Sequence, residues 1–428
     1  FIDVYTCWCG PCKMMAAETF PQKKVGDVFN ANFINYKIDA EKGEGIAIAQ
    51  KFEVRAFPTY LFVNGDGELV YRVVGYMKAE PFLEEANIAI REKNDPKPFV
   101  QWEKEYQNGK RDKSFLLAYM KKRALLKLPS AEIAEEVFPM LTKDELTDKE
   151  VISSIVYYDP AVQFVPEGKV FSYVMKNYRH LDSTGLVKYP LGVMETGITN
   201  YFRKNIIAGR KEKMLPVAIS AMQKVMKADG ASQAEITENE KELTYLYYDG
   251  TKNKTKLAPA VIDYVDNGLM KLDIAGKQKA DAEGYKKFME PYLNGTKDSL
   301  TDPSFAMMNR LQKAEKMVSV SYSLRSVAET VYKNFTDEKL LTTALGWAKQ
   351  AEEWFPHFST EAVYAGLLYK TGNKEEAIRM MTKASQDSFL AQAPDTKKLL
   401  LENAETMKQG KLPAGLWRVD MPTTVAAK

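Results

Sequence analysis

The N-terminal part of the chain carries short apolar runs separated by amphipathic stretches. Runs rich in β-branched and aromatic residues predict strands at 1–5, 33–39, 59–63 and 69–74. Stretches with apolar residues at helical spacing predict helices at 12–20, 45–52 and 78–93. Asn64-Gly65-Asp66-Gly67, between the last two strands, is a strong hairpin-turn signal. The predicted order is β-α-β-α-β-β-α, which is that of a small α/β domain.

Beyond residue 113 the apolar residues keep a spacing of about 3.6, and no segment predicts a strand. Breakers such as Pro129, Pro166 and Gly230 separate the amphipathic segments. The predicted helices cover 114–127, 130–141, 168–179, 190–207, 214–228, 233–248, 257–272, 276–292, 303–333, 340–354, 360–370 and 374–386. The C-terminal part of the chain should therefore be an all-α helical array.

Small residues recur at regular positions in the last predicted helices. Gly372, Ala377 and Ala384 lie in one helix–turn–helix segment, and Ala344 and Ala351 lie in the helix before it. This spacing resembles the tetratricopeptide repeat, in which small residues let paired helices pack closely. The alternative is a generic helical domain with a fortuitous match.

Breaks in the pattern suggest domain boundaries. The stretch Asn94-Asp95-Pro96-Lys97-Pro98 should end the α/β domain, because its composition favours turns over regular structure. We expect the α/β domain at 1–95, a linker at 96–113, an all-helical domain at 114–317, tetratricopeptide-like helices at 318–412 and a tail at 413–428.

Composition narrows the classes of function. The 60 basic and 57 acidic residues leave a formal charge of +3, so charge gives no reason to expect nucleic-acid binding. No apolar run approaches the roughly 18 residues that a membrane-spanning helix needs. The chain begins at Phe1, inside a predicted strand and without an initiator Met, so we expect that residues ahead of it were removed. A signal peptide among them would be invisible in this sequence.

Candidate chemistry is concentrated near the N-terminus. The 3 cysteines of the chain are Cys7, Cys9 and Cys12, whereas its 2 histidines are remote from them. So few thiols cannot form a framework of several disulfides, and a closed zinc site wants about four Cys or His ligands, so we expect no metal. A structural disulfide and a catalytic redox pair remain. A bridge across so short a loop contributes little stability, which favours the redox pair.

The predicted surroundings of Cys9-Gly10-Pro11-Cys12 also favour redox chemistry. The segment follows a buried strand and opens a helix, whose N-terminus stabilises an anion through unpaired N–H groups and the helix dipole. Thiolate is the reactive form of cysteine. Cys9, at the exposed end, is therefore the expected nucleophile, and Cys12, one turn further on, is the expected resolving thiol.

The stretch Trp8-Cys9-Gly10-Pro11-Cys12-Lys13 resembles the active-site motif of the thioredoxin family. Other marks of the family occur in the same order: Asp3 in the buried strand, the loop Arg55-Ala56-Phe57-Pro58-Thr59, and Gly75 after the last strand. The resemblance covers 1–93. It implies a thioredoxin fold whose usual first strand and helix are missing from the chain.

The resemblance also implies roles for these residues. Cys9, Cys12 and Asp3 would be catalytic, and Asp3 would exchange a proton with Cys12. The peptide bond before Pro58 would be cis, and this loop would lie against the disulfide. The substrate-binding positions would be Trp8, Gly10, Pro11, Phe57, Pro58, Thr59 and Gly75. No metal or organic cofactor is implied beyond the redox-active disulfide itself.

The sequence departs from the usual family pattern at two positions. Asn35 stands where many thioredoxins have a lysine that pairs with the buried carboxylate, and Ala17 stands where the active-site helix usually has a kinking proline. The segment 16–39 resembles extracytoplasmic thioredoxin-like domains, including those of membrane electron-relay proteins. Its fusion to helices resembles multidomain thioredoxin-fold proteins of Bacteroidetes-like bacteria. We therefore expect a periplasmic or other extracytoplasmic location, with the cytoplasm as the alternative.

Cys7 is the cysteine without an assigned role. On an extended approach to Cys9 we expect it to be a small buried hydrophobe with a free thiol, and the alternative is a third redox-active or metal-sensitive thiol. His180 and His357 should be solvated or capping residues.

These patterns together predict a thiol:disulfide oxidoreductase, and the Gly-Pro pair between the cysteines resembles reducing members of the family more than oxidising ones. Its substrates would be protein disulfides, and the helical part would dock a substrate or partner protein. The upstream reductant has no signature in the sequence. The rival hypothesis is a helical-repeat binding protein whose thioredoxin-like domain serves mainly as a docking module.

Overall fold

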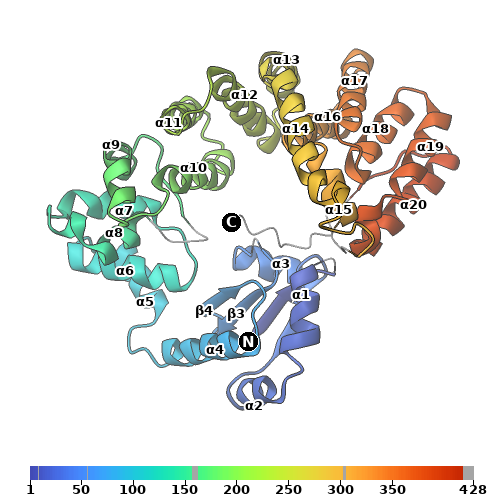
Figure 1. The fold of residues 1–428 in the computed structure, drawn as a ribbon. Helices are drawn as coiled ribbons and strands as arrows, with labels where there is room; N and C mark the ends of the chain where they lie inside the picture. The colour runs from blue at the N-terminus through green and yellow to red at the C-terminus, as the bar shows by residue number, and fades with distance from the viewer. Residues whose placement is uncertain (8, 55, 157–161, 302–304, 418–428) are drawn as a thin grey trace. The chain divides into compact units, whose positions relative to one another are not determined.

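The structure is a computed structural model that describes residues 1–7, 9–54, 56–156, 162–301 and 305–417 of the 428-residue chain. The chain forms two compact units, Phe1–Asp229 and a second unit that begins at Gly230. Strands gather in the first part of the first unit, and the remaining described ribbon is helical (Figure 1). The predicted change from an α/β domain to an all-α array is therefore confirmed for the described residues. No helix among them is long and apolar enough to cross a bilayer.

A four-stranded mixed sheet forms the centre of the α/β domain, with the strand order β2-β1-β3-β4. β1 pairs in parallel with β2 and antiparallel with β3, which in turn pairs antiparallel with β4. The strands are β1 (Ile2–Tyr5), β2 (Tyr36–Asp39), β3 (Thr59–Val63) and β4 (Leu69–Val74). The strand predicted at 33–39 is shorter than expected, because the helix before it extends to Asn32.

Helices cover both faces of this sheet. One face packs against η1, α2 and α4 through an aromatic core that includes Phe29, Tyr60 and Phe82, whereas the other face packs Val4 and Leu61 against α3. The helices are α1 (Gly10–Met14), the π-helical η1 (Met15–Thr19), α2 (Lys23–Asn32), α3 (Glu44–Lys51) and α4 (Ala79–Lys93). This is the arrangement that the resemblance to thioredoxin implied.

Two details of these helices differ from the sequence-based expectation. Helix α2 was not predicted, although Val25 and Phe29 mark its buried face at helical spacing. The active-site helix contains a π-helical turn around Ala17, the position where the family pattern has a proline.

The rest of the first unit is helical. Its helices are α5 (Phe99–Gln107), α6 (Lys113–Leu125), α7 (Ala131–Val137), α8 (Lys149–Val156), α9 (Lys169–Ser183), α10 (Pro190–Tyr201), the π-helical η4 (Phe202–Ile207) and α11 (Leu215–Ala228). The segment expected to be a linker thus contains α5, and α8 was not predicted. Helix α6 is attached to the α/β domain: Leu125 packs against its aromatic core, and the buried Lys122 ammonium contacts Glu92 and lies 2.6 Å from Asp95.

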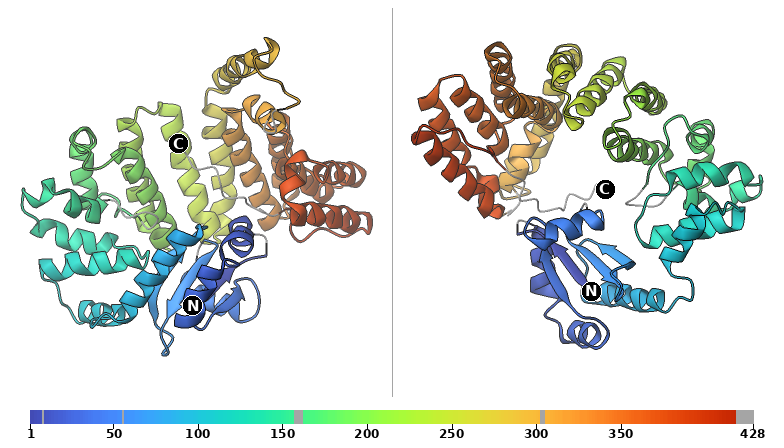
Figure 2. Two further views of the ribbon diagram at one scale, coloured as in Figure 1. Left: turned by 60° about the horizontal axis from the view of Figure 1, so that its bottom comes forward. Right: turned by 180° about the vertical axis from the view of Figure 1, so that it is seen from behind.

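The second unit is a series of helices joined by short connections. They are α12 (Gln233–Gly250), α13 (Lys254–Asn267), α14 (Ile274–Leu293), α15 (Phe305–Gln312), α16 (Met317–Asn334), α17 (Glu338–Trp354), α18 (Phe358–Lys370), α19 (Lys374–Ala384) and α20 (Pro394–Lys408). The helix predicted at 303–333 is two helices, and α20 was not predicted. Helices α16 to α20 lie side by side in both views of Figure 2 and share one core. Of the small residues singled out above, the alanines are buried in this core, namely Ala344, Ala351, Ala377 and Ala384, whereas Gly372 is exposed in a turn.

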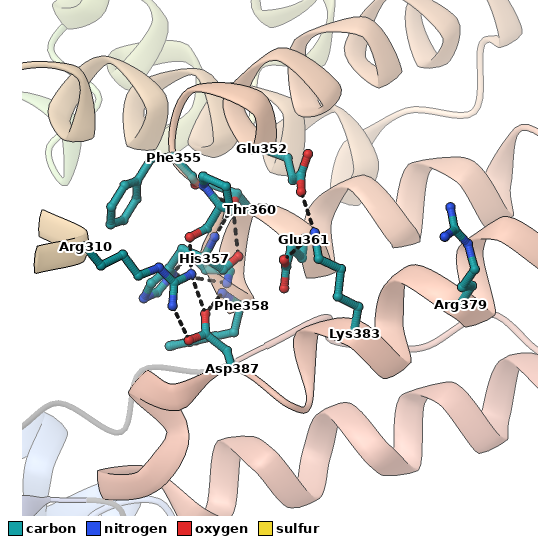
Figure 3. A network of polar contacts seen from close by, with 12 residues as sticks. Arg310, Glu352, Phe355, His357, Phe358, Thr360, Glu361, Arg379, Lys383 and Asp387 are labelled. Carbon is teal, nitrogen blue, oxygen red and sulfur yellow. Dashed lines mark hydrogen bonds and ion pairs between the residues drawn. The ribbon is translucent and has the colours of Figure 1, made fainter. Parts of the chain in front are cut away.

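A buried polar network joins α18 to the helices around it (Figure 3). The Asp387 carboxylate accepts hydrogen bonds from the backbone N–H of Phe358 at 2.7 Å and from Arg310 Nη2 at 3.0 Å. Burial opposes ionisation of Asp387, but Arg310 and the backbone N–H of Phe389 outweigh this effect and lower its pKa. His357 caps the start of α18, and burial lowers its pKa to about 4. The expected capping role of His357 is confirmed, and His180 is exposed, as expected.

Candidate active site

Cys9 and Cys12 form a disulfide at the start of α1. Cys9 is the N-cap residue, with extended backbone, and its Sγ accepts a hydrogen bond from the backbone N–H of Cys12 at 3.1 Å. Pro11 occupies the first helical turn, where its fixed φ is compatible with the helix and its missing N–H has no cost. The predicted position of the cysteines at a helix N-terminus is therefore confirmed. An anion on Cys9 would lie where the helix dipole and the free N–H groups stabilise it.

The expected difference in exposure between these cysteines is wrong for the disulfide form. Cys9 is 2% exposed and Cys12 is 5% exposed, so neither presents an open sulfur. The reason is that Cys9 caps the helix and its sulfur points toward the first turn, where it bonds the Cys12 N–H. Trp8 lies outside the described residues.

Asp3 lies in β1 and is 4% exposed. Its antiparallel partner is Tyr60, whose side chain packs on the face of the sheet that η1 covers, so Asp3 faces the active-site helix. Burial disfavours the charged carboxylate and raises the pKa of Asp3 to about 6, while Lys37 acts in the opposite direction. Such a group changes its protonation close to neutral pH, as a proton donor and acceptor should.

Lys37 is a residue of the site that the sequence-based prediction did not include. Its Nζ lies 3.9 Å from Asp3 Oδ2, because residues 3 and 37 are register partners in the parallel pair β1–β2. Asn35, in contrast, is exposed and bonds Asn30. A cation therefore reaches the carboxylate from a position two residues after the family's usual one. The register of β1 and β2 pairs these residues, and the sequence of neither strand contains that register.

Three buried polar atoms at this end of the sheet lack a hydrogen-bond partner among the described residues. They are Asp3 Oδ1, Thr6 Oγ1 and the Tyr60 hydroxyl. Burial and the Asp3 charge raise the pKa of Tyr60, which keeps this hydroxyl protonated. Buried polar groups are normally satisfied, and exceptions concentrate at functional sites. The carboxyl group of Asp3 thus keeps one oxygen available for proton exchange.

The loop before β3 lies at the same end of the sheet as the disulfide. β1 leads directly toward Cys9, and Thr59, the first residue of β3, pairs with Val4 of β1. The Phe57–Pro58 peptide bond is cis. The Pro58 carbonyl accepts a hydrogen bond from the Gly75 N–H at 2.9 Å, so the loop is tied to the end of β4.

Gly75 adopts a backbone conformation that glycine allows and that most other residues avoid. Its φ is +97°, a conformation that residues with a Cβ rarely adopt. Nothing lies within 4 Å of the place where a Cβ would be, so the requirement for glycine comes from the backbone and not from a neighbour. The structure therefore brings Pro58, Thr59 and Gly75 together at one end of the sheet.

Cys7 does not have the predicted environment. It is exposed, and its thiol is free. The prediction assumed an extended approach to Cys9, but β1 ends at Tyr5 and the chain then turns, with the Cys9 N–H bonded to the Thr6 carbonyl at 3.2 Å. The turn directs Cys7 to solvent. The expected pairing, in which Cys7 stays free while Cys9 joins Cys12, agrees with the structure.

Comparison with known proteins identifies the α/β domain. A family model described as a thioredoxin-like domain matches residues 1–88. Thioredoxin from Staphylococcus saprophyticus is 39% identical over 84 residues, which cover 19% of this chain and 74% of that protein. Thioredoxin-2 from Saccharomyces cerevisiae is 41% identical over 76 residues, covering 17% of this chain and 64% of that protein.

Two further proteins are similar to the same part of the chain. The thiol:disulfide interchange protein DsbD of Yersinia pestis is 33% identical over 86 residues, which are 19% of this chain but 14% of that protein. A solution structure of a candidate disulphide-isomerase from Bacteroides thetaiotaomicron is 44% identical and covers 21% of this chain and 74% of that one, with a TM-score of 0.20. The matched segment contains the Cys9–Cys12 disulfide and the loop at Pro58. Through this N-terminal domain, the chain belongs to the thioredoxin family of thiol:disulfide oxidoreductases.

Proposed function

We propose that the protein reduces disulfides in protein substrates through Cys9 and Cys12, and that its helices hold the substrate or a partner protein. The observation that carries this proposal is the Cys9–Cys12 disulfide at the N-terminus of α1, at the same end of the sheet as Pro58. A disulfide with a purely structural role would gain nothing from a helix N-terminus that stabilises a thiolate.

The proposed reaction starts from the reduced enzyme. The Cys9 thiolate attacks one sulfur of the substrate disulfide, which forms a Cys9–substrate bond, breaks the substrate S–S bond and releases one substrate thiolate. Cys12, one helical turn away, then gives its proton to Asp3 and attacks the Cys9 sulfur. This step closes the Cys9–Cys12 disulfide and releases the second substrate thiolate. Two electrons have passed from the dithiol to the substrate, and a thiol reductant must return them.

Asp3 has the properties that the second step needs. With a pKa of about 6, it is mostly ionised at neutral pH and can accept the Cys12 proton, and it is basic enough to hold that proton briefly. The substrate would lie along the loop at Pro58. The proposed contacts are Trp8, Gly10, Pro11, Phe57, Pro58, Thr59 and Gly75. No metal or organic cofactor takes part in this scheme.

The finer assignments also belong to the proposal. We assign a reducing direction because the Gly-Pro pair between the cysteines resembles reducing members of the family. An extracytoplasmic location rests on the resemblance of segment 16–39 to extracytoplasmic thioredoxin-like domains. Helices α17 to α19 would be tetratricopeptide-like: the turn at Gly372 has a φ of +93°, and Ala377 and Ala384 are fully buried where the helices meet.

Trapping of the mixed disulfide tests this function. A Cys12→Ser variant cannot complete the second step, so it should accumulate covalent adducts between Cys9 and its substrates, which mass spectrometry would identify. The wild-type chain should also reduce insulin in the presence of dithiothreitol, and Cys9→Ala should abolish this activity. A wild-type chain without turnover, together with a Cys12→Ser variant without adducts, would favour the docking module instead.

A further inference from the structure

A pocket of about 380 Å³ lies beside the loop that contains Pro58. One wall includes Ala56 and Thr59 from this loop and the start of β3, and Val74 from the end of β4. Thr59 directly follows Pro58, and Val74 directly precedes Gly75 and is the register partner of Thr59 across the β3–β4 pair. This wall is therefore continuous with the loop to which we assign substrate binding.

The opposite wall comes from the helical part of the first unit. Lys127, Leu128 and Pro129 contribute from the connection between α6 and α7, and Lys204 contributes from η4. Helix α6 is held against the α/β domain by the buried Lys122 and by Leu125, so the position of this connection is defined. A thioredoxin-like domain on its own would lack this wall. The pocket is thus specific to a chain in which the helices follow that domain.

The charges around the pocket favour an anion. Among the described residues, Arg72, Lys127 and Lys204 line it, and Glu53 is the one carboxylate that does so. Arg72 is only 7% exposed, and its Nη2 donates a hydrogen bond to the Phe52 carbonyl. Guanidinium and ammonium groups in partly buried positions bind carboxylates through charge-assisted hydrogen bonds.

Gln163 gives an independent sign of a ligand. Its side chain is 7% exposed and lines the same pocket, and its Oε1 accepts a hydrogen bond from Asn205 at 2.8 Å. Its Nε2 is buried and has no hydrogen-bond partner in the part of the chain that the structure describes. A buried amide that keeps one polar atom unsatisfied is uncommon, and an occupant with an acceptor oxygen would satisfy it.

We propose that this pocket binds an acidic side chain of the protein whose disulfide is exchanged. The inference rests on the proposed function, and it gives the helices a role in it: they supply half of a pocket that selects substrates with an Asp or Glu near the reacting cysteine. Binding of the carboxylate by Lys127 and Gln163 positions the substrate chain along the loop at Pro58. The effect should appear in kcat/KM, because the contact forms when the substrate binds.

Paired peptides test this selection on the full-length chain. A set of peptides, each closed by one disulfide, would carry Glu, Gln or Lys at successive positions flanking the cysteines, and acid-quenched mass spectrometry would follow their reduction. At the position that reaches the pocket, the Glu peptide should react with a kcat/KM roughly three- to tenfold above that of the Gln peptide. Lys127→Glu should reverse the order, so that the Lys peptide reacts faster than the Glu peptide. Gln163→Leu should reduce the preference for Glu.

Ratios between peptides keep the test valid if a variant folds less well, since a loss of folded enzyme lowers every rate equally. Lys188→Met, at an exposed lysine of the same unit outside the pocket, is the matched control and should keep the wild-type preference. Equal rates for Glu and Gln peptides at every position, or an unchanged preference in Lys127→Glu, would overturn the pocket while the proposed reductase stands. Absence of turnover for all peptides would instead overturn the reductase, and this proposal with it.

Discussion

Replacement of Asp3 by Asn should make the thioredoxin-like domain more stable at neutral pH while it slows the reaction. Folding raises the pKa of this carboxyl to about 6 from its ordinary value of 3.8, because the buried position disfavours its charge. The folded state therefore holds its proton more tightly than the unfolded state does. As pH rises from about 4 to above 6, the free energy of unfolding of the wild type falls. The loss is about 1.4 kcal/mol for each unit by which the folded and unfolded pKa values differ, or about 3 kcal/mol in all. The Asn variant avoids this cost, because it carries no charge at any pH.

The figure of about 3 kcal/mol is an upper value, since Asn brings its own buried amide and loses the attraction of Lys37. We expect Asp3→Asn to gain about 1–3 kcal/mol in free energy of unfolding at pH 8 and almost nothing at pH 4. Hydrogen exchange of the central strand β3, followed by mass spectrometry, measures this quantity for one domain of a long chain. Comparison of variant and wild type at the same pH removes the intrinsic pH dependence of exchange.

Asp27→Asn is the matched control, because Asp27 is an exposed carboxylate of α2 in the same domain, with 59% of its side chain accessible. This variant should follow wild type at both pH values. A gain for Asp3→Asn that is equal at pH 4 and pH 8 would show that the charge of Asp3 is not the cause. A loss of stability at pH 8 would refute the reasoning altogether. In a single turnover of the reduced enzyme with Cys12 intact, Asp3→Asn should slow the step of Cys12 while attack by Cys9 is little changed.

Other predictions follow from particular residues. Cys7→Ser should leave insulin reduction within a few-fold of wild type, because the thiol is free and exposed; a loss comparable to that of Cys9→Ala would make Cys7 a third member of the redox centre. Gly75→Ala should lower the free energy of unfolding by about 1–2 kcal/mol through its positive φ, and an unchanged denaturation midpoint would contradict this. Asp387→Asn should destabilise the helices around α18 by about 2–4 kcal/mol, because it leaves Arg310 without its carboxylate. Since the pKa of Asp387 is lowered in the folded protein, its contribution is present near neutral pH and is lost as pH falls through that lowered pKa; protease sensitivity of α18 that stayed constant with pH would argue against it.

Local sequence patterns were sufficient to predict the class of fold and the position of the redox centre. Strands at 59–63 and 69–74 were predictable because β-branched and aromatic residues flank a strong turn signal, and helix α4 was predictable from its 3.6-residue period. The cysteine pair was recognisable because its chemistry depends on a helix start a few residues away. Helix α2 was missed because polar residues dilute its apolar pattern, and α8 was missed because a short run of Val and Ile does not by itself distinguish a helix from a strand.

The environment of each site residue depended on the tertiary structure. The pairing of Lys37 with Asp3 needed the register of two parallel strands, which the sequence of either strand does not contain. The exposure of Cys7 depended on where β1 ends, and the burial of Cys9 depended on its hydrogen bond to the first turn of α1. The pocket between Thr59 and Lys127 joins the sheet to a helical connection of the same unit, far apart in the chain. Such contacts arise between segments far apart in the chain, so their geometry is fixed by packing, whereas the periodic patterns that specify helices and strands act over a few residues.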